Sequence, residues 1–165
     1  MTGTRRRAPP ALVPVEVQRV AVDATTPADD ALTGWAERVM QRMSDAPART
    51  DVCIRLVDEE ESRGLNRDYR GIDRSTNVLS FPAGLELPEG EGKILGDIVI
   101  CDPVVRREAQ AQGKLEDEHY AHMVIHGMLH LYGYDHEDPA EADVMEDIER
   151  EILGRLGIAD PYRAA

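Results

Sequence analysis

The residues best suited to chemistry are histidines gathered in one short stretch of the chain. All five lie within 18 positions, at His119, His122, His126, His130 and His136. His126 and His130 are four residues apart, so on a helix both imidazoles project from the same face, one turn apart. Gly133 allows the backbone to turn after that helix, so that His136 can return as a third ligand. This spacing predicts a metal ion held by His126, His130 and His136.

Three histidine ligands favour a catalytic zinc ion over a structural one. They leave the fourth position of a tetrahedral ion open to water, whose pKa falls toward about 7 on the metal, so that hydroxide forms at neutral pH. A set of His122, His126 and His130 would stretch about 12 Å along a straight helix, which is too far for one ion. His119 and His122 are therefore expected to support the ligands or to pack around them. Histidines on a helix without any metal are the alternative.

The site lacks the general base of a peptidase. Its spacing matches the H-E-x-x-H-x-x-G-x-x-H pattern of metzincin proteases, in which the glutamate after the first histidine takes a proton from water. Gly127 occupies that position here and has no group that could accept the proton. A zinc peptidase or amidase therefore remains only an alternative, and a phosphodiester reaction would need a cation to stabilise its transition state.

The charge distribution leaves one short basic segment inside an acidic protein. The formal net charge is −13, and residues 83–165 hold 7 basic and 19 acidic residues. Residues 62–82 instead carry four arginines against Asp68 and Asp73, namely Arg63, Arg67, Arg70 and Arg74. Binding to nucleic acid normally relies on such cations. Composition alone leaves open whether this segment binds RNA or is only the solvated face of a helix.

Hydrophobic patterning predicts strands separated by helices, with the last third entirely helical. Strands are expected at 15–22, 51–58, 77–81 and 94–101. Helices are expected at 27–42, 59–69, from Asp102 onward, at 116–132 and at 138–156. Pro82 is expected to end the third strand and to begin a surface loop at 82–93, and Asp102 is expected to cap the helix that follows it.

These elements indicate an α+β fold in a single domain. We expect a mixed sheet of about four strands packed against helices, with the metal site on a C-terminal helix and the turn after it. Residues 1–14 are expected to be a flexible tail, and residues 15–165 to be the domain. The N-terminal residues lack the apolar stretch typical of a signal peptide, and no apolar run approaches the length needed to span a bilayer, so a cytoplasmic location is expected.

Three ordered motifs resemble those of the YbeY endoribonucleases, the bacterial rRNA maturation factors. The first is HGMLHLYGYDH at 126–136. The second runs from Leu65 to Pro82 and is similar to the family's LN-x-x-YR-x-x-D-x-x-T-x-VLSFP, and the third is LGDI at 95–98. Ser75 stands where the family usually has proline. The resemblance covers about residues 60–158.

The resemblance implies a zinc-dependent endoribonuclease specific for single-stranded RNA. It implies action in 16S rRNA 3′-end maturation and ribosome quality control, with precursor 16S rRNA and the small ribosomal subunit or its proteins as partners. DNA and membranes are not expected as partners. By position, His126, His130 and His136 correspond to the ligands of one zinc ion per chain, and Arg70 to the family's functional arginine in the cleft. A guanidinium there could hold a phosphate and neutralise charge that develops on it.

Four further residues are weaker candidates for the site. Asp97 and Asp135 could orient a ligand histidine, His122 could support the ligands, and Tyr69 could stack on a base. A ribosome-assembly factor without catalytic activity, in which the metal is structural, is the remaining alternative. The acidic surface would suit docking onto a basic ribosomal protein.

Overall fold

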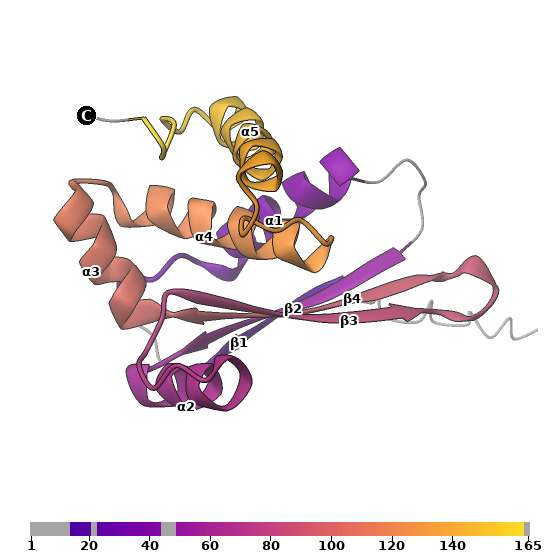
Figure 1. Cartoon of the computed structure of the whole chain (residues 1–165), viewed down its shortest axis with the longest axis horizontal. Coiled ribbons are helices and arrows are strands. Elements are labelled where there is room, and N and C mark those ends of the chain that lie inside the picture. Colours follow the sequence, from indigo (N-terminus) through magenta and orange to yellow (C-terminus); the bar gives the residue numbers. More distant parts are fainter. Residues whose placement is uncertain (1–13, 21–22, 44–48, 164–165) are drawn as a thin grey trace, which may run out of the picture.

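A four-stranded mixed sheet forms the centre of the described chain (Figure 1). The computed structural model describes residues 14–20, 23–43 and 49–163. The strands are β1 (Val15–Arg19), β2 (Arg49–Val57), β3 (Val78–Glu86) and β4 (Gly92–Cys101), in the order β1-β2-β4-β3. β1, β2 and β4 run parallel, and β3 pairs antiparallel with β4 as an edge strand. Residues 1–13 of the expected flexible tail lie outside the residues that the structure describes.

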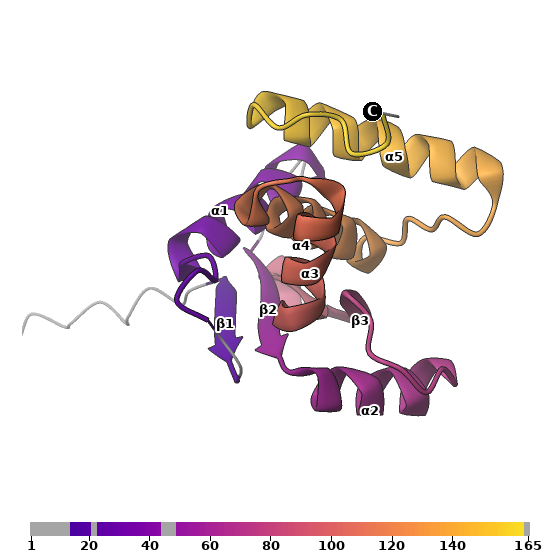
Figure 2. The ribbon, with the colours of Figure 1, turned by 90° about the vertical axis from the view of Figure 1, so that its left-hand side faces the viewer.

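Helices cover the two faces of the sheet unequally. The helices are α1 (Asp29–Met43), α2 (Glu59–Arg70), α3 (Asp102–Gln112), α4 (Glu116–Leu131) and α5 (Pro139–Arg155). Figures 1 and 2 show α1, α3 and α4 on one face, α5 stacked outside α4, and α2 alone on the opposite face. This arrangement confirms the predicted α+β fold. No helix among the described residues is long and apolar enough to cross a membrane.

The central position of α4 explains its composition. The helix packs on the sheet, on α1 and α3, and beneath α5, so most of its residues are buried. A helix enclosed in this way needs apolar side chains on nearly every side, as Met123, Val124, Ile125, Met128 and Leu129 provide. These contacts with the hydrophobic core hold α4 in place, together with the histidines that it carries.

Local capping signals determine where α2 begins and ends. The Asp58 carboxylate accepts a hydrogen bond from the Glu61 backbone N–H at 2.8 Å, which caps the N-terminus. Gly71 takes a left-handed conformation at φ 72° and ends the helix. Arg70 is consequently the last helical residue, so its side chain projects from the end of α2.

Two expectations about local structure are wrong. β3 continues through Pro82 to Glu86 and forms a long hairpin with β4, because an edge strand loses no ladder hydrogen bond to a proline that faces outward. Asp102 does not cap α3, whose N-cap is Cys101. The Asp102 carboxylate is buried and accepts hydrogen bonds from Thr26 at 3.0 Å, from Arg106 at 2.9 Å and from the Tyr120 hydroxyl.

Candidate metal centre and cleft

The end of α4 and the turn after it bring three histidines together. Ring nitrogens of His126, His130 and His136 lie within 4.8 Å of one another. His126 and His130 are one helical turn apart, as their spacing requires, and their Nε2 atoms are 3.1 Å apart. Gly133 adopts φ 95°, so the chain reverses there and returns His136 to the same place.

The three nitrogens fit a tetrahedral metal ion. Two nitrogens bound to one zinc ion at about 2.0–2.1 Å are roughly 3.3 Å apart, close to the separation of the two Nε2 atoms. Burial, together with the nearby imidazoles of His126 and His136, lowers the pKa of His130 to about 4. His130 is therefore neutral at physiological pH and offers a lone pair, as a metal ligand must.

A buried carboxylate that the sequence analysis missed lies behind the histidines. Glu149 of α5 has no exposed surface, and its two oxygens accept hydrogen bonds from His126 Nδ1 at 2.7 Å and His122 Nε2 at 2.8 Å. The Tyr162 hydroxyl also donates to it. Burial raises the pKa of Glu149, but the hydrogen bonds from His122 and His126 outweigh burial and lower the pKa to about 2. Burial lowers the pKa of His122, which is thus a neutral donor.

One signal in the sequence could have drawn attention to Glu149. Apolar residues at 145, 148, 152 and 153 face the core from α5, and Glu149 falls on the same stripe. Lysine, arginine and acidic residues are almost never fully buried unless they are paired. A glutamate at a core position of an amphipathic helix therefore indicates a partner inside the protein.

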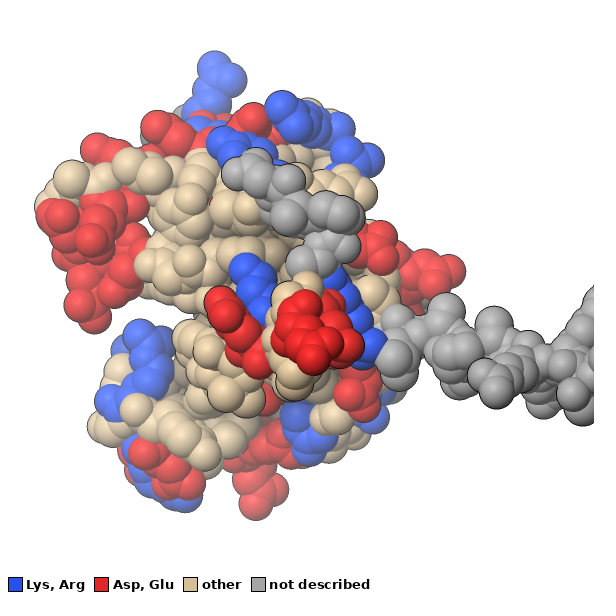
Figure 3. Space-filling view, turned by 90° about the vertical axis from the view of Figure 1, so that its right-hand side faces the viewer, with Lys and Arg blue, Asp and Glu red and all other residues tan. Residues whose placement is uncertain are grey.

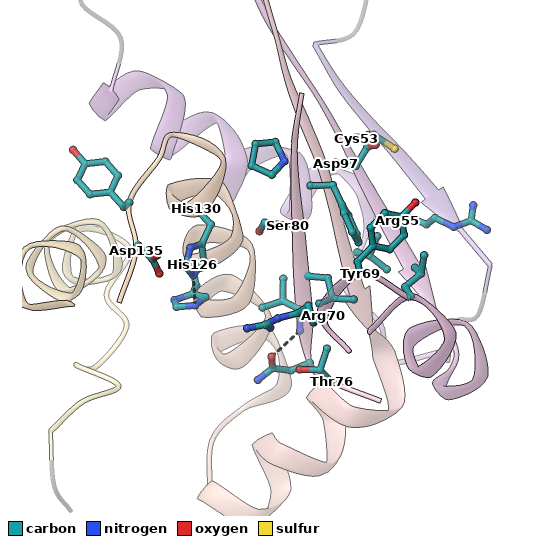
Figure 4. A pocket seen from close by; sticks show the side chains of 18 of the residues that line it. Cys53, Arg55, Tyr69, Arg70, Thr76, Ser80, Asp97, His126, His130 and Asp135 are labelled. Atoms are coloured by element: carbon teal, nitrogen blue, oxygen red, sulfur yellow. Dashed lines mark hydrogen bonds between the residues drawn. The ribbon is translucent and has the colours of Figure 1, made fainter. Parts of the chain in front are cut away.

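A cleft of about 1260 Å³ joins the histidines to Arg70. Its walls include the ligand histidines, strand β3 and the C-terminal end of α2. In Figure 4, the side chain of Arg70 points toward His126 and His130. Among the residues that the structure describes, Arg63 pairs with Asp73 and Arg67 with Asp68, whereas no carboxylate pairs with Arg70. The guanidinium of Arg70 is therefore free to bind an anion in the cleft.

The other candidate residues occupy different parts of the same cleft. Tyr69 is 70% exposed, and its ring meets Phe81 edge-on with the centroids 4.9 Å apart. The Asp135 carboxylate accepts the His136 backbone N–H at 2.7 Å and so fixes the turn that carries this histidine. Asp97 is exposed on β4, next to Ile98, which packs toward α4, so alternation along the strand directs Asp97 to the opposite face of the sheet.

Gly127 lets α4 approach the sheet closely. A Cβ atom at this position would lie 2.9 Å from Ile98 Cγ2, 3.2 Å from Val78 Cγ2 and 3.3 Å from Ser80 Oγ. The residue after the first ligand thus faces the sheet, where no larger side chain fits. A glutamate that acts as a general base has no room at this position.

We expect Gly127→Ala to destabilise the protein by about 1 to 2 kcal/mol, because overpacking outweighs the gain in helix propensity. Gly34→Ala in α1 is the matched control, since its Cβ would meet nothing within 4 Å. That control should instead stabilise by roughly 0.5 to 1 kcal/mol. Urea unfolding of both variants measures the difference. A Gly127→Ala protein at least as stable as the wild type would contradict the tight packing of α4 on the sheet.

Comparison with known proteins identifies the family to which the chain belongs. The family profile described as "Endoribonuclease YbeY" matches residues 19–157. The chain belongs to the YbeY endoribonuclease family. Curated members named "Endoribonuclease YbeY" include one from Halorhodospira halophila, 54% identical over 85% of this chain and 90% of the relative. Another, from Pseudomonas putida, is 51% identical over 92% of this chain and 94% of the relative.

A solved structure has the same fold. The solution structure of a protein from Thermotoga maritima is 26% identical, with a TM-score of 0.51, and the match covers 91% of this chain and 99% of that protein. The three motifs noted in the sequence fall inside the range matched to the YbeY family. The resemblance inferred from those motifs is therefore confirmed.

Proposed function

We propose that this chain is a zinc-dependent endoribonuclease that cleaves single-stranded RNA in the cleft between the three histidines and Arg70. The observation that carries the proposal is the convergence of three ring nitrogens beside an arginine that no described carboxylate pairs with. Histidine nitrogens suit zinc, and three of them leave a position for water or substrate. Relatives named as endoribonucleases support RNA as the substrate.

The residues of the cleft divide the work. His126, His130 and His136 would hold one zinc ion, which supplies a Lewis acid for a phosphate oxygen or an activated water. Arg70 would bind the same phosphate through its planar guanidinium and neutralise the charge that develops on it. Asp135 would hold His136 in place through its backbone N–H.

The remaining cleft residues favour an unpaired strand over a duplex. Tyr69 and Phe81 present an aromatic surface on which an unstacked base could lie, and bases in single strands are free to do so. Asp97 would line the part of the cleft that receives the substrate, and it would not contact a metal ligand. Figure 3 shows acidic and basic side chains interspersed around a largely uncharged hollow on this face.

We further propose the cellular role that the family resemblance implies. The chain would act in the cytoplasm on precursor 16S rRNA, in 3′-end maturation and in ribosome quality control. Its partner would be the small ribosomal subunit or one of its proteins. The acidic surface, with a formal net charge of −13, would favour a basic protein as the docking partner.

Two alternatives have less support. A zinc peptidase or amidase would need a base at position 127, where the close approach of α4 to the sheet excludes a larger side chain. A ribosome-assembly factor with a structural metal would normally fill all four ligand positions with protein side chains. The described part of the chain brings three ring nitrogens together in an open cleft instead.

The proposal is tested with an end-labelled RNA that carries a single-stranded 3′ tail. We expect the zinc-loaded chain to cut the tail, and we expect cutting to stop when a chelator removes the metal and to return when zinc is added. Annealing a complementary strand over the tail should protect it, and a DNA strand of the same sequence should stay intact. Cleavage that persists in the metal-free protein, or that is unaffected by annealing the complementary strand, would contradict the proposal.

A further inference from the structure

We propose that Glu149 is the positioning residue of the metal centre and that Tyr162 in the C-terminal segment closes over it. This inference rests on the proposed zinc site and extends it to a carboxylate on a different helix. Glu149 touches no substrate in this role. It acts through His126 by deciding which ring nitrogen of that histidine carries the proton.

The argument begins with the hydrogen-bonding capacity of the groups. An ionised carboxylate can only accept hydrogen bonds, whereas a neutral imidazole donates from one nitrogen and accepts at the other. Glu149 Oε1 lies 2.7 Å from His126 Nδ1, so this nitrogen must carry the proton. The lone pair of His126 is then left on Nε2, which faces His130 Nε2 at 3.1 Å. The carboxylate thereby prepares the ring for a metal before any metal binds.

The position of Glu149 is costly, which argues against a merely structural role. Its side chain has no exposed surface, and no lysine or arginine pairs with it in the described part of the chain. A buried charge without a cation is tolerated only when hydrogen bonds satisfy it. An apolar residue would complete the stripe of Met145, Ile148 and Ile152 on α5 at lower cost.

His122 completes the support on the α4 side. Its Nε2 is 2.8 Å from Glu149 Oε2, and its Nδ1 is buried with no hydrogen-bond partner. A proton on Nδ1 would therefore be unsatisfied, so His122 is neutral and donates from Nε2. Both oxygens of Glu149 thus face histidine donors on the same helix, one turn apart, and the carboxylate cannot rotate without losing a bond.

The segment after α5 seals the carboxylate from solvent. The Tyr162 hydroxyl donates to Glu149, and its ring stands edge-on to His122 with the centroids 5.5 Å apart. Asp160 holds Tyr162 in place by accepting its backbone N–H at 2.8 Å and the Arg150 Nε–H at 3.0 Å. Residues 158–163 are therefore part of the support of the metal site, although they lie far from the ligands in sequence.

Glu149→Gln tests the role, with Glu108→Gln as the matched control. The glutamine amide would place an N–H₂ group against one of the two histidine donors and release His126 to the other tautomer. We expect zinc to bind about 10- to 100-fold more weakly, measured by competition with a chromophoric chelator. Glu108 of α3 makes an equivalent contact, at 3.1 Å, with His119, which lies on α4 like His126 but is outside the ligand set. Glu108→Gln should leave zinc affinity unchanged.

A second measurement reports the tautomer of His126 directly in the folded protein. Nitrogen-15 NMR of the metal-free wild-type chain should show the His126 proton on Nδ1, and Glu149→Gln should shift it toward Nε2. A wild-type proton on Nε2, or equal weakening of zinc binding by both glutamine variants, would overturn the inference. Unchanged zinc affinity in Glu149→Gln would do the same. Failure of the wild type to bind zinc at all would instead overturn the proposed function.

Discussion

His130→Ala is expected to lose the metal and, with it, cleavage of RNA. The substitution removes the central one of three nitrogen donors and leaves His126 and His136, which are ten residues apart. Zinc content after gel filtration should fall from one ion per chain to none. The rate of RNA cleavage should fall by at least about 10³-fold, because metal assistance is worth several kcal/mol. Alanine is a good helix former, so α4 should persist.

His119→Gln is the control for this variant. His119 lies on the same helix and is buried, but it contacts Glu108 instead of the ligand set. It should keep one zinc ion per chain and cleave RNA at nearly the wild-type rate. An His130→Ala protein that retains a full equivalent of zinc at wild-type affinity would exclude the three-histidine site.

Arg70→Lys is expected to reduce cleavage by about 10²- to 10³-fold while zinc binding stays intact. Lysine keeps the charge, but it lacks the planar fork that can hold two phosphate oxygens at once. A loss of this size is typical when one group that stabilises developing charge is removed. Because the interaction strengthens in the transition state, the fall should appear in kcat more than in KM.

Arg67→Lys is the matched control on the same helix. Arg67 lies three residues before Arg70, is exposed, and is paired with Asp68. Its substitution should change cleavage less than about 3-fold, because exposed ion pairs contribute little. Equal losses in the two lysine variants would mean that α2 contributes only general positive charge. Unchanged cleavage by Arg70→Lys would remove Arg70 from the reaction.

The parts of the site that the sequence revealed are the parts set by local geometry. His126 and His130 share a helix face because they are four residues apart, and Gly133 marks the turn that returns His136. These relations need no knowledge of the rest of the fold. The four strands and five helices of the described residues were predictable for the same reason, since each follows from periodicity and capping within a short window.

The parts that were missed depend on contacts between distant segments. Glu149 lies 23 residues after His126 on another helix, and only the packing of α5 on α4 brings the two together. Asp102 reads as a helix cap, but Thr26 and Tyr120 bind its carboxylate from other elements. Pro82 reads as the end of a strand, whereas the position of β3 at the edge of the sheet allows the strand to continue.

The availability of the arginines also depends on contacts that the sequence does not reveal. The sequence places four arginines in residues 62–82 without distinguishing them. In the folded chain, Arg63 and Arg67 are paired with Asp73 and Asp68, and only their neighbour Arg70 combines a place in the cleft with the end of α2. Tertiary contacts decide which arginine is available to bind a phosphate, and the composition of the sequence does not reveal those contacts.

The most direct test of the central claim is cleavage of one labelled RNA with a single-stranded 3′ tail by three proteins in parallel. The zinc-loaded wild type should cut the tail, His130→Ala should fail for lack of metal, and Arg70→Ala should fail while retaining one zinc ion. Circular dichroism of both variants must match the wild type. Equal cleavage by all three would contradict the zinc-and-arginine nuclease and would favour the assembly-factor alternative.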